Sequence, residues 1–205
     1  MDVAAPYRAL ANSLDVAILV ELTRVAAPVT VPELQRRLSG GSDRGLRLAL
    51  ARRVEHGIVR ETHVGRTTVY ALNDEHLAAP AVVALAEMRK LLLSRIRELV
   101  ASWAVRPLHA SLFGSAARRD GDVGSDIDLL VIRPASVPEA HHEWRQQLES
   151  LEDRVRAWTG NPVQISELSE GQLDEMRPAV ARELTADAVT LAGLDAEVVF
   201  NRVRR

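Results

Sequence analysis

The chain has 205 residues, a formal net charge of −2 at pH 7 and no cysteine. Acidic and basic side chains nearly balance, so any contact with nucleic acid must come from a local basic patch, and the lack of cysteine excludes disulfides, thiol catalysis and cysteine-ligated zinc. No segment approaches the roughly 18 consecutive apolar residues of a membrane span, and residues 1–7 lack a signal-peptide pattern, so we expect a cytoplasmic protein with no membrane contact.

Two helices are predicted in the first forty residues. Residues 14–26 repeat apolar side chains at helical spacing. Thr30 and Glu33 have the spacing of a capping box and a proline follows in the first turn, which predicts that a second helix begins near Val31.

A third helix is predicted over residues 43–56, because Ser42 can cap its start and Gly57 can end it. The apolar side chains of this helix would form one face. Three arginines lie on or beside the opposite face: Arg44, Arg47 and Arg52. An exposed face that carries arginine is typical of a helix that contacts nucleic acid.

Two short β-prone runs, residues 58–62 and 67–72, flank a turn that contains Arg66, which predicts a hairpin with a basic tip. Three helices followed by a hairpin resemble the winged helix-turn-helix of bacterial one-component regulators, over about residues 10–73. The resemblance implies that the three helix arginines contact the major groove of double-stranded DNA or its phosphates, and that Arg66 reaches the backbone or the minor groove. The alternative is a winged helix used only for protein contacts, with solvated arginines.

A long helical pattern over residues 81–103 follows Pro80 and predicts a linking helix. Its apolar stripe can pack equally well on its own domain or on a second copy of the chain. We expect a homodimer mainly because operator-binding winged helices commonly pair by two-fold symmetry.

The most informative stretch of the chain begins with a Gly-Ser turn. Residues 108–113 are typical of a buried strand, and the small residues Gly114 and Ser115 that follow would let the backbone approach a phosphate at the start of the next helix. Arg118 would add a fixed positive charge there. These features predict a phosphate-binding turn.

A pair of acidic residues follows on the next predicted strand. Asp126 and Asp128 stand two residues apart, so they share one face, roughly 7 Å apart along the strand, while the apolar residues between and after them face a core. Two carboxylates on one face can bind Mg²⁺. The chain has no Walker-type glycine-rich loop, which disfavours a P-loop NTPase.

This motif resembles the polymerase-beta-like nucleotidyltransferase superfamily, and most closely its minimal nucleotidyltransferases, in which Gly-Ser, a nearby arginine and Ser-Asp-x-Asp-Leu follow one another. The resemblance implies that Ser115 and nearby amides hold the triphosphate of an NTP and that Arg118 neutralises it. It also implies that Asp126 and Asp128 bridge two Mg²⁺ ions that clamp the attacking and leaving oxygens of an in-line displacement. The implied nucleotide-binding residues are Gly114, Ser115, Arg118 and Ser125. The alternative is a Gly-Ser turn before a strand with an acidic solvent face.

The third carboxylate that the resemblance implies is missing at its expected place. On the predicted strand 163–166, Gln164 stands where an aspartate would complete the metal site and accept a proton from the acceptor hydroxyl. An amide cannot act as a general base. Glu167 would point to the other face of a regular strand, unless a bulge rotates it toward the metal.

These elements predict an α+β protein with a winged helix-turn-helix domain at residues 1–79, a linking helix at 80–104 and a nucleotidyltransferase α/β domain at 105–205. We expect the last domain to contain a small mixed sheet with helices on one side.

Three functions stay open. The leading hypothesis is a Mg²⁺-dependent nucleotidyltransferase that moves a nucleoside monophosphate from NTP to a hydroxyl of a protein or tRNA, while its first domain binds DNA and autoregulates a toxin–antitoxin pair. The acceptor class and the toxin–antitoxin role follow from the resemblance alone. The alternatives are a transcription regulator whose degenerate transferase domain senses a nucleotide, which Gln164 favours, and a protein-binding antitoxin or adaptor.

Overall fold

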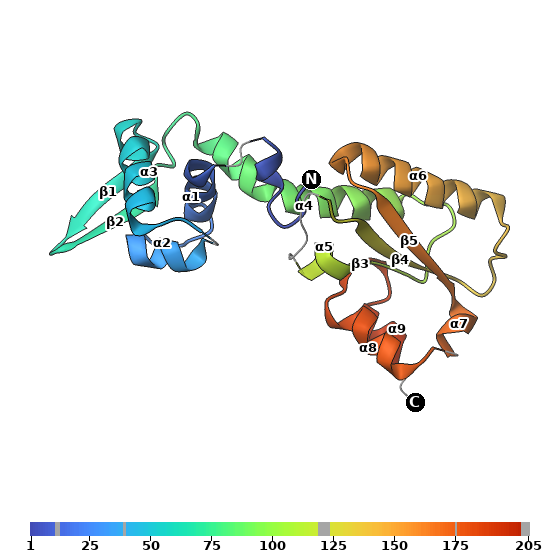
Figure 1. Ribbon diagram of the computed structural model, residues 1–205. Helices are drawn as coiled ribbons and strands as arrows, with labels where there is room; N and C mark the ends of the chain where they lie inside the picture. Colours follow the sequence, from blue (N-terminus) through green and yellow to red (C-terminus); the bar gives the residue numbers. More distant parts are fainter. Residues whose placement is uncertain (11–12, 39, 119–123, 175, 202–205) are drawn as a thin grey trace. The chain divides into compact units, whose positions relative to one another are not determined.

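The computed structural model describes residues 1–10, 13–38, 40–118, 124–174 and 176–201 (Figure 1). Contacts divide the chain into two units, Pro6–Met88 on the one hand and Met1–Ala5 with Arg89–Arg205 on the other. The division differs from the predicted one, because the boundary falls inside helix α4 (Ala79–Ala101) and the first five residues belong to the C-terminal unit. No described helix is long and apolar enough to cross a membrane.

The unit Pro6–Met88 consists of short helices and one hairpin. Its elements are a 3-10 turn (Pro6–Ala9), α1 (Leu14–Leu22), α2 (Val31–Arg37), α3 (Asp43–Glu55), β1 (Val59–Val64) and β2 (Thr67–Leu72), followed by the start of α4. The helix starts agree with the predicted caps: Thr30 and Glu33 form the capping box of α2, and the Ser42 side chain accepts a hydrogen bond from the Gly45 amide.

The core of this unit joins its α-helices and the hairpin. Ile18 from α1, Leu34 from α2 and Leu46 from α3 are fully buried together. The hairpin is tied to the chain before α2 by two backbone hydrogen bonds of 2.9 and 2.8 Å between Val29 and Tyr70. The packed core of this unit therefore anchors α3 and the hairpin, so the exposed face of α3 and the hairpin turn have a fixed support.

The C-terminal unit is built on a four-stranded mixed sheet in the order β5-β4-β3-β6. Its strands are β3 (His109–Phe113), β4 (Ile127–Arg133), β5 (Val163–Ser169) and β6 (Val189–Gly193). Its helices, besides the end of α4, are α5 (Gly114–Arg118), α6 (His142–Thr159), α7 (Glu170–Asp174), α8 (Pro178–Ala186) and α9 (Ala196–Asn201). The β4–β5 pair is parallel and the other pairs are antiparallel, so the predicted mixed sheet is confirmed.

Helices cover both faces of this sheet, which corrects the expectation of helices on one side (Figure 1). Leu129 of β4 packs toward α4 and α6, where Ile96 and Leu151 are buried. Leu130, the next residue, packs in a second cluster with Phe200 of α9. A strand that is apolar on both faces is sandwiched between two layers, and the unbroken apolar run after Asp128 is the sequence feature that corresponds to it.

Candidate functional site

Gly114 lies at the end of β3, directly against the carboxylate of Asp128. The strands β3 and β4 pair Phe113 with Asp128, which brings the next residue beside this side chain. Gly114 has a φ of +67°, and a Cβ at this position would lie 2.4 Å from Asp128 Oδ2. The backbone conformation therefore favours glycine here, and any side chain at this position would displace the Asp128 carboxylate.

Asp126 and Asp128 form a pair of carboxylates at the start of β4. Burial raises the pKa of Asp128 above its ordinary value, and the negative charge of Asp126 raises that pKa further, while Arg118 lowers it. A half-buried carboxylate with a raised pKa beside a second carboxylate favours binding of a cation. Carboxylate oxygens are hard ligands, so the donor set fits Mg²⁺.

The described residues supply only part of a metal coordination shell. Among them, no group of three or more His, Asp or Glu side chains is placed to hold a metal ion. Mg²⁺ is commonly held by one or two carboxylates while water and substrate phosphates fill its other positions. The pair Asp126 and Asp128 therefore fits a metal that arrives with a phosphorylated ligand.

The short helix α5 places the predicted phosphate-binding residues next to this pair. It begins at Gly114, so half-buried Ser115 lies in its first turn and Arg118 is its last residue. Arg118 Nη1 lies 3.8 Å from Asp187 Oδ2, and its charge reaches Asp128. Ser125, immediately before the carboxylate pair, accepts a hydrogen bond through its backbone oxygen from Asn161 Nδ2 at 2.9 Å.

Gln164 lies beside Asp128 on the neighbouring strand. The parallel pairing of β4 with β5 aligns Asp128 with Gln164 and stays in register along all seven residues of β5. Aligned residues on adjacent strands point to the same face of a sheet, and Gln164 is exposed, so its amide stands on the carboxylate face at the open edge.

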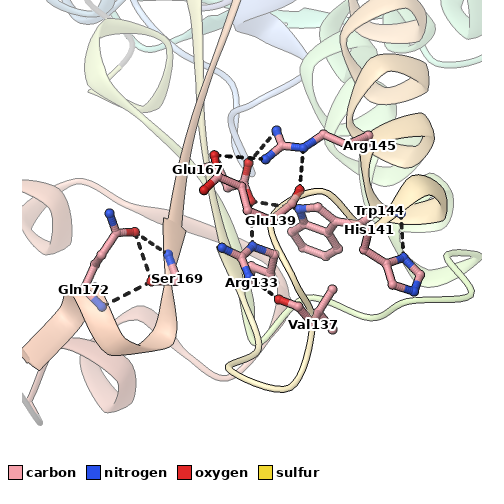
Figure 2. A network of polar contacts seen from close by, with 9 residues as sticks. All are labelled: Arg133, Val137, Glu139, His141, Trp144, Arg145, Glu167, Ser169 and Gln172. Carbon is pink, nitrogen blue, oxygen red and sulfur yellow. Dashed lines mark hydrogen bonds and ion pairs between the residues drawn. The ribbon is translucent and has the colours of Figure 1, made fainter.

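Of the two candidates for the third position, only Gln164 lies on that face. Glu167 stands on the opposite face, where its Oε1 accepts hydrogen bonds from Arg133 Nε at 2.8 Å and Trp144 Nε1 at 3.0 Å (Figure 2). Its Oε2 lies 2.8 Å from Arg145 Nη1. No bulge interrupts the strand, so these groups hold Glu167 away from the carboxylate pair.

The predicted DNA-contact arginines divide into paired and unpaired ones. Arg44 on α3 and Arg66 in the hairpin turn are exposed and form no ion pair within the described residues. Arg47 Nε lies 2.7 Å from Asp43 Oδ2, one turn earlier on the same helix. This pairing leaves Arg47 on the exposed face of α3.

Arg52 is engaged inside its own unit, which the sequence did not indicate. Its Nη2 lies 2.8 Å from Asp15 Oδ2, and Arg53 Nε lies 3.0 Å from Asp15 Oδ1. Burial opposes ionisation of Asp15, but hydrogen bonds and charge interactions with the two arginines outweigh it and hold the pKa of Asp15 below its ordinary value. These contacts join α1 to α3.

Comparison with known families bears on the C-terminal unit. Residues 93–182 match the family model described as a nucleotidyltransferase domain. The match includes Gly114, Asp126, Asp128 and Gln164. It covers less than half of the chain and does not extend to the unit Pro6–Met88.

No curated protein matches the chain. A toxin–antitoxin crystal structure with AMP-PNP is 17% identical, with a TM-score of 0.40 over 55% of this chain and 83% of that chain. A mutant of the toxin–antitoxin MntA–HpeT is 15% identical, with a TM-score of 0.39 over 55% of this chain and 83% of that chain. A second MntA–HpeT mutant is 18% identical, with a TM-score of 0.38 over 54% of this chain and 81% of that chain.

Proposed function

We propose that the nucleotidyltransferase domain is a Mg²⁺-dependent enzyme that transfers a nucleoside monophosphate from an NTP to a hydroxyl and releases pyrophosphate. The observation that supports this most strongly is the contact between Gly114 and the Asp128 carboxylate within the matched domain. The contact supports the proposal, because transfer from an NTP requires the groups that hold the phosphates to lie beside the groups that hold the metal.

Each residue of the site has a proposed role. Asp126 and Asp128 would hold the proposed two Mg²⁺ ions, which would supply positive charge to the phosphates and to the acceptor hydroxyl. Ser115 donates a hydrogen bond to the triphosphate, and Arg118 offsets its negative charge. Gln164 can orient a group at the reacting phosphate by hydrogen bonds, but it cannot accept the acceptor's proton.

The proposed acceptor is a hydroxyl of a protein or a tRNA, and the proposed setting is a toxin–antitoxin pair that autoregulates its own transcription. This part of the proposal follows by analogy with minimal nucleotidyltransferases. Gln164 is exposed on an edge strand, which supports a large acceptor in this proposal.

We propose that the unit Pro6–Met88 is a winged helix-turn-helix that binds double-stranded DNA as a homodimer. The order of three helices and a hairpin supports this reading, as do Arg44 and Arg66, which are exposed and form no ion pair with any residue that the structure describes. Arg47 would join them once its guanidinium leaves Asp43, and Arg52 would support α3 through Asp15 rather than read a base.

A second candidate function is a transcription regulator that binds NTP as an effector without transferring it. The observation that favours it is the amide of Gln164 in register with Asp128, where a third carboxylate would be expected of an efficient transferase. Such a regulator would change its DNA affinity when MgATP or MgGTP binds.

Incubation of the purified chain with labelled NTPs, Mg²⁺ and cell lysate separates the two functions. A transferase labels a protein or tRNA band and releases pyrophosphate, and the double variant Asp126→Ala with Asp128→Ala does neither. A sensor binds nucleotide, shifts its DNA affinity and releases no pyrophosphate. Failure of the wild-type chain to bind any NTP in the presence of Mg²⁺ would contradict both functions.

A further inference from the structure

Arg89 of α4 secures the helix that carries the phosphate-binding residues. The side chain is buried, with 9% of the residue exposed, and its Nη1 donates a hydrogen bond of 2.8 Å to the backbone oxygen of Ala116. Its Nη2 donates a hydrogen bond of 3.4 Å to the backbone oxygen of Ala117. A five-residue helix such as α5 cannot satisfy its last carbonyls internally, so the guanidinium fixes the helix end next to Arg118.

The same guanidinium holds the first residues of the chain. Arg89 Nη1 also donates to the backbone oxygen of Val3 at 3.4 Å, and the Val3 side chain is buried in the core between sheet and helices. Asp2 Oδ1 accepts hydrogen bonds of 2.9 Å from the amides of Ala4 and Ala5, which fixes the turn of this segment. Figure 1 shows the N-terminus beside α4.

Asn161 secures the other half of the site. It lies in the turn between α6 and β5, is only 1% exposed, and donates through Nδ2 to the backbone oxygen of Ser125 at 2.9 Å. Its Oδ1 accepts a hydrogen bond from the amino group of Met1, and the neighbouring Pro162 oxygen accepts one from the Ile127 amide at 2.9 Å. The backbone on both sides of Asp126 is therefore fixed by this turn.

We infer that Arg89 and Asn161 are positioning residues of the proposed nucleotide site, connected to each other by residues 1–3. Arg89 fixes α5 with Ser115 and Arg118, and Asn161 fixes the strand start with Asp126. The inference rests on the proposed binding of Mg²⁺ and NTP by these groups. Neither residue touches the nucleotide; together they set the separation of the cationic and anionic halves of the site, which must be held to within a fraction of an ångström.

Arg133 provides a matched control, because its side chain lies on the face of the sheet opposite the carboxylate pair. It is also 9% exposed and also donates to a backbone oxygen, that of Val137, while its Nε donates to Glu167 (Figure 2). Substitution of either arginine by lysine keeps the charge and removes the planar fork of donors. Of these two arginines, Arg89 is the one whose described hydrogen bonds reach α5, the helix that carries Ser115 and Arg118.

The experiment measures MgATP binding to the full chain by isothermal titration, together with the melting temperature of each variant. Arg89→Lys should weaken MgATP binding by about 10–100-fold, the usual effect of losing a group that orients a ligand. Arg133→Lys should change the affinity for MgATP by less than about twofold, even if its melting temperature falls as much as that of Arg89→Lys. Asn161→Asp keeps an acceptor for the amino group and loses the donor to Ser125, so it should weaken binding like Arg89→Lys.

The outcomes separate this inference from the proposed function. Unchanged affinity in Asn161→Asp overturns it, as does an equal loss of affinity in Arg133→Lys, and in either case the binding function stands. If Arg89→Lys does not fold, Asn161→Asp alone decides. Absence of MgATP binding by the wild-type chain overturns the proposed function and the inference together.

Discussion

Asp15 and the pair formed by Asp126 and Asp128 have opposite electrostatic surroundings. Asp15 meets two arginines, Arg52 and Arg53, which hold its pKa below the ordinary value in spite of burial. Asp128 is also partly buried, but its nearest charged neighbour on the strand is Asp126, and burial with this repulsion raises its pKa. The same residue type stabilises the fold in one place and costs stability in the other.

The difference separates structural from functional carboxylates. A carboxylate whose partners lie within the chain needs no ligand, whereas a pair that repel each other is stabilised further when a cation binds. Glu167 belongs with Asp15, because Arg133 and Arg145 surround it (Figure 2). The comparison supports the proposed ligand site at Asp126 and Asp128 and predicts how each group responds to substitution.

The largest expected effect comes from removing the repelling pair. The double variant Asp126→Ala with Asp128→Ala should show no measurable Mg²⁺-dependent binding of ATP or GTP by calorimetry, because both hard ligands are lost. Its melting temperature without Mg²⁺ should not fall, since the repulsion between the carboxylates is also lost. Asp15→Asn is the control and should bind MgATP like the wild type; unchanged nucleotide affinity in the double variant would show that the site lies elsewhere.

A second prediction restores a carboxylate at the third position. Gln164→Asp should raise the rate of pyrophosphate release by up to about 10²–10⁴-fold, the usual contribution of a general base. Ser166→Asp is the matched control, because Ser166 is also exposed and points to the same face but pairs with Leu130 instead of Asp128. Equal rates in both variants would place Gln164 outside the reacting centre.

Close packing at Gly114 gives the third prediction. Gly65 has a φ of +61°, and a Cβ there would have no described atom within 4 Å apart from its adjacent residues, so Gly65→Ala should cost about 1–2 kcal/mol of unfolding free energy from the backbone alone. Gly114→Ala has a similar φ of +67° but should cost more and also weaken MgATP binding, because its Cβ meets the Asp128 carboxylate. Denaturant unfolding and titration of both variants check this, and equal behaviour of the two would contradict the contact.

The fourth prediction compares an arginine that forms no ion pair among the described residues, Arg44, with one that is paired to an aspartate, Arg52. Arg44→Ala should weaken binding to DNA from the region upstream of the gene by about 1–3 kcal/mol if it reads a base, or reduce the salt dependence by about one ion if it contacts a phosphate. Arg52→Ala should reduce stability through Asp15 and leave the DNA affinity of the folded protein nearly unchanged. Gel-shift titrations over a range of salt concentrations test this pair, and the reverse ranking would count against it.

The smallest effect is expected at Asp15. Asp15→Asn should lower the unfolding free energy by about 1 kcal/mol at neutral pH, since its arginine partners are partly solvated. The pKa of Asp15 is depressed in the folded protein, so this stabilisation is complete above the ordinary value of 3.8 and is lost as the pH falls through the lower folded value. Melting curves should therefore converge for the two proteins at low pH; a difference that persists there would indicate a cause other than charge.

The sequence by itself determined the features that depend on neighbouring residues. The caps of α2 and α3 follow from Thr30, Glu33 and Ser42, because a capping side chain bonds to amides only a few residues away. The closeness of Asp126, which directly precedes β4, to Asp128 within that strand follows from their separation of two residues. The Gly-Ser turn could also be predicted, because Gly114 and Ser115 are adjacent in the sequence. The contact of Gly114 with the Asp128 carboxylate could not be predicted in this way.

Tertiary structure alone decided the features that depend on which distant segments meet. The register of β4 and β5 places Gln164 beside Asp128 and sends Glu167 to the arginines on the other face. The two-sided cover of the sheet and the pairing of Asp15 with Arg52 arise in the same way. Such contacts carry no periodic signal along the chain, because they are selected by packing and by the need of buried polar groups for partners once the fold has formed.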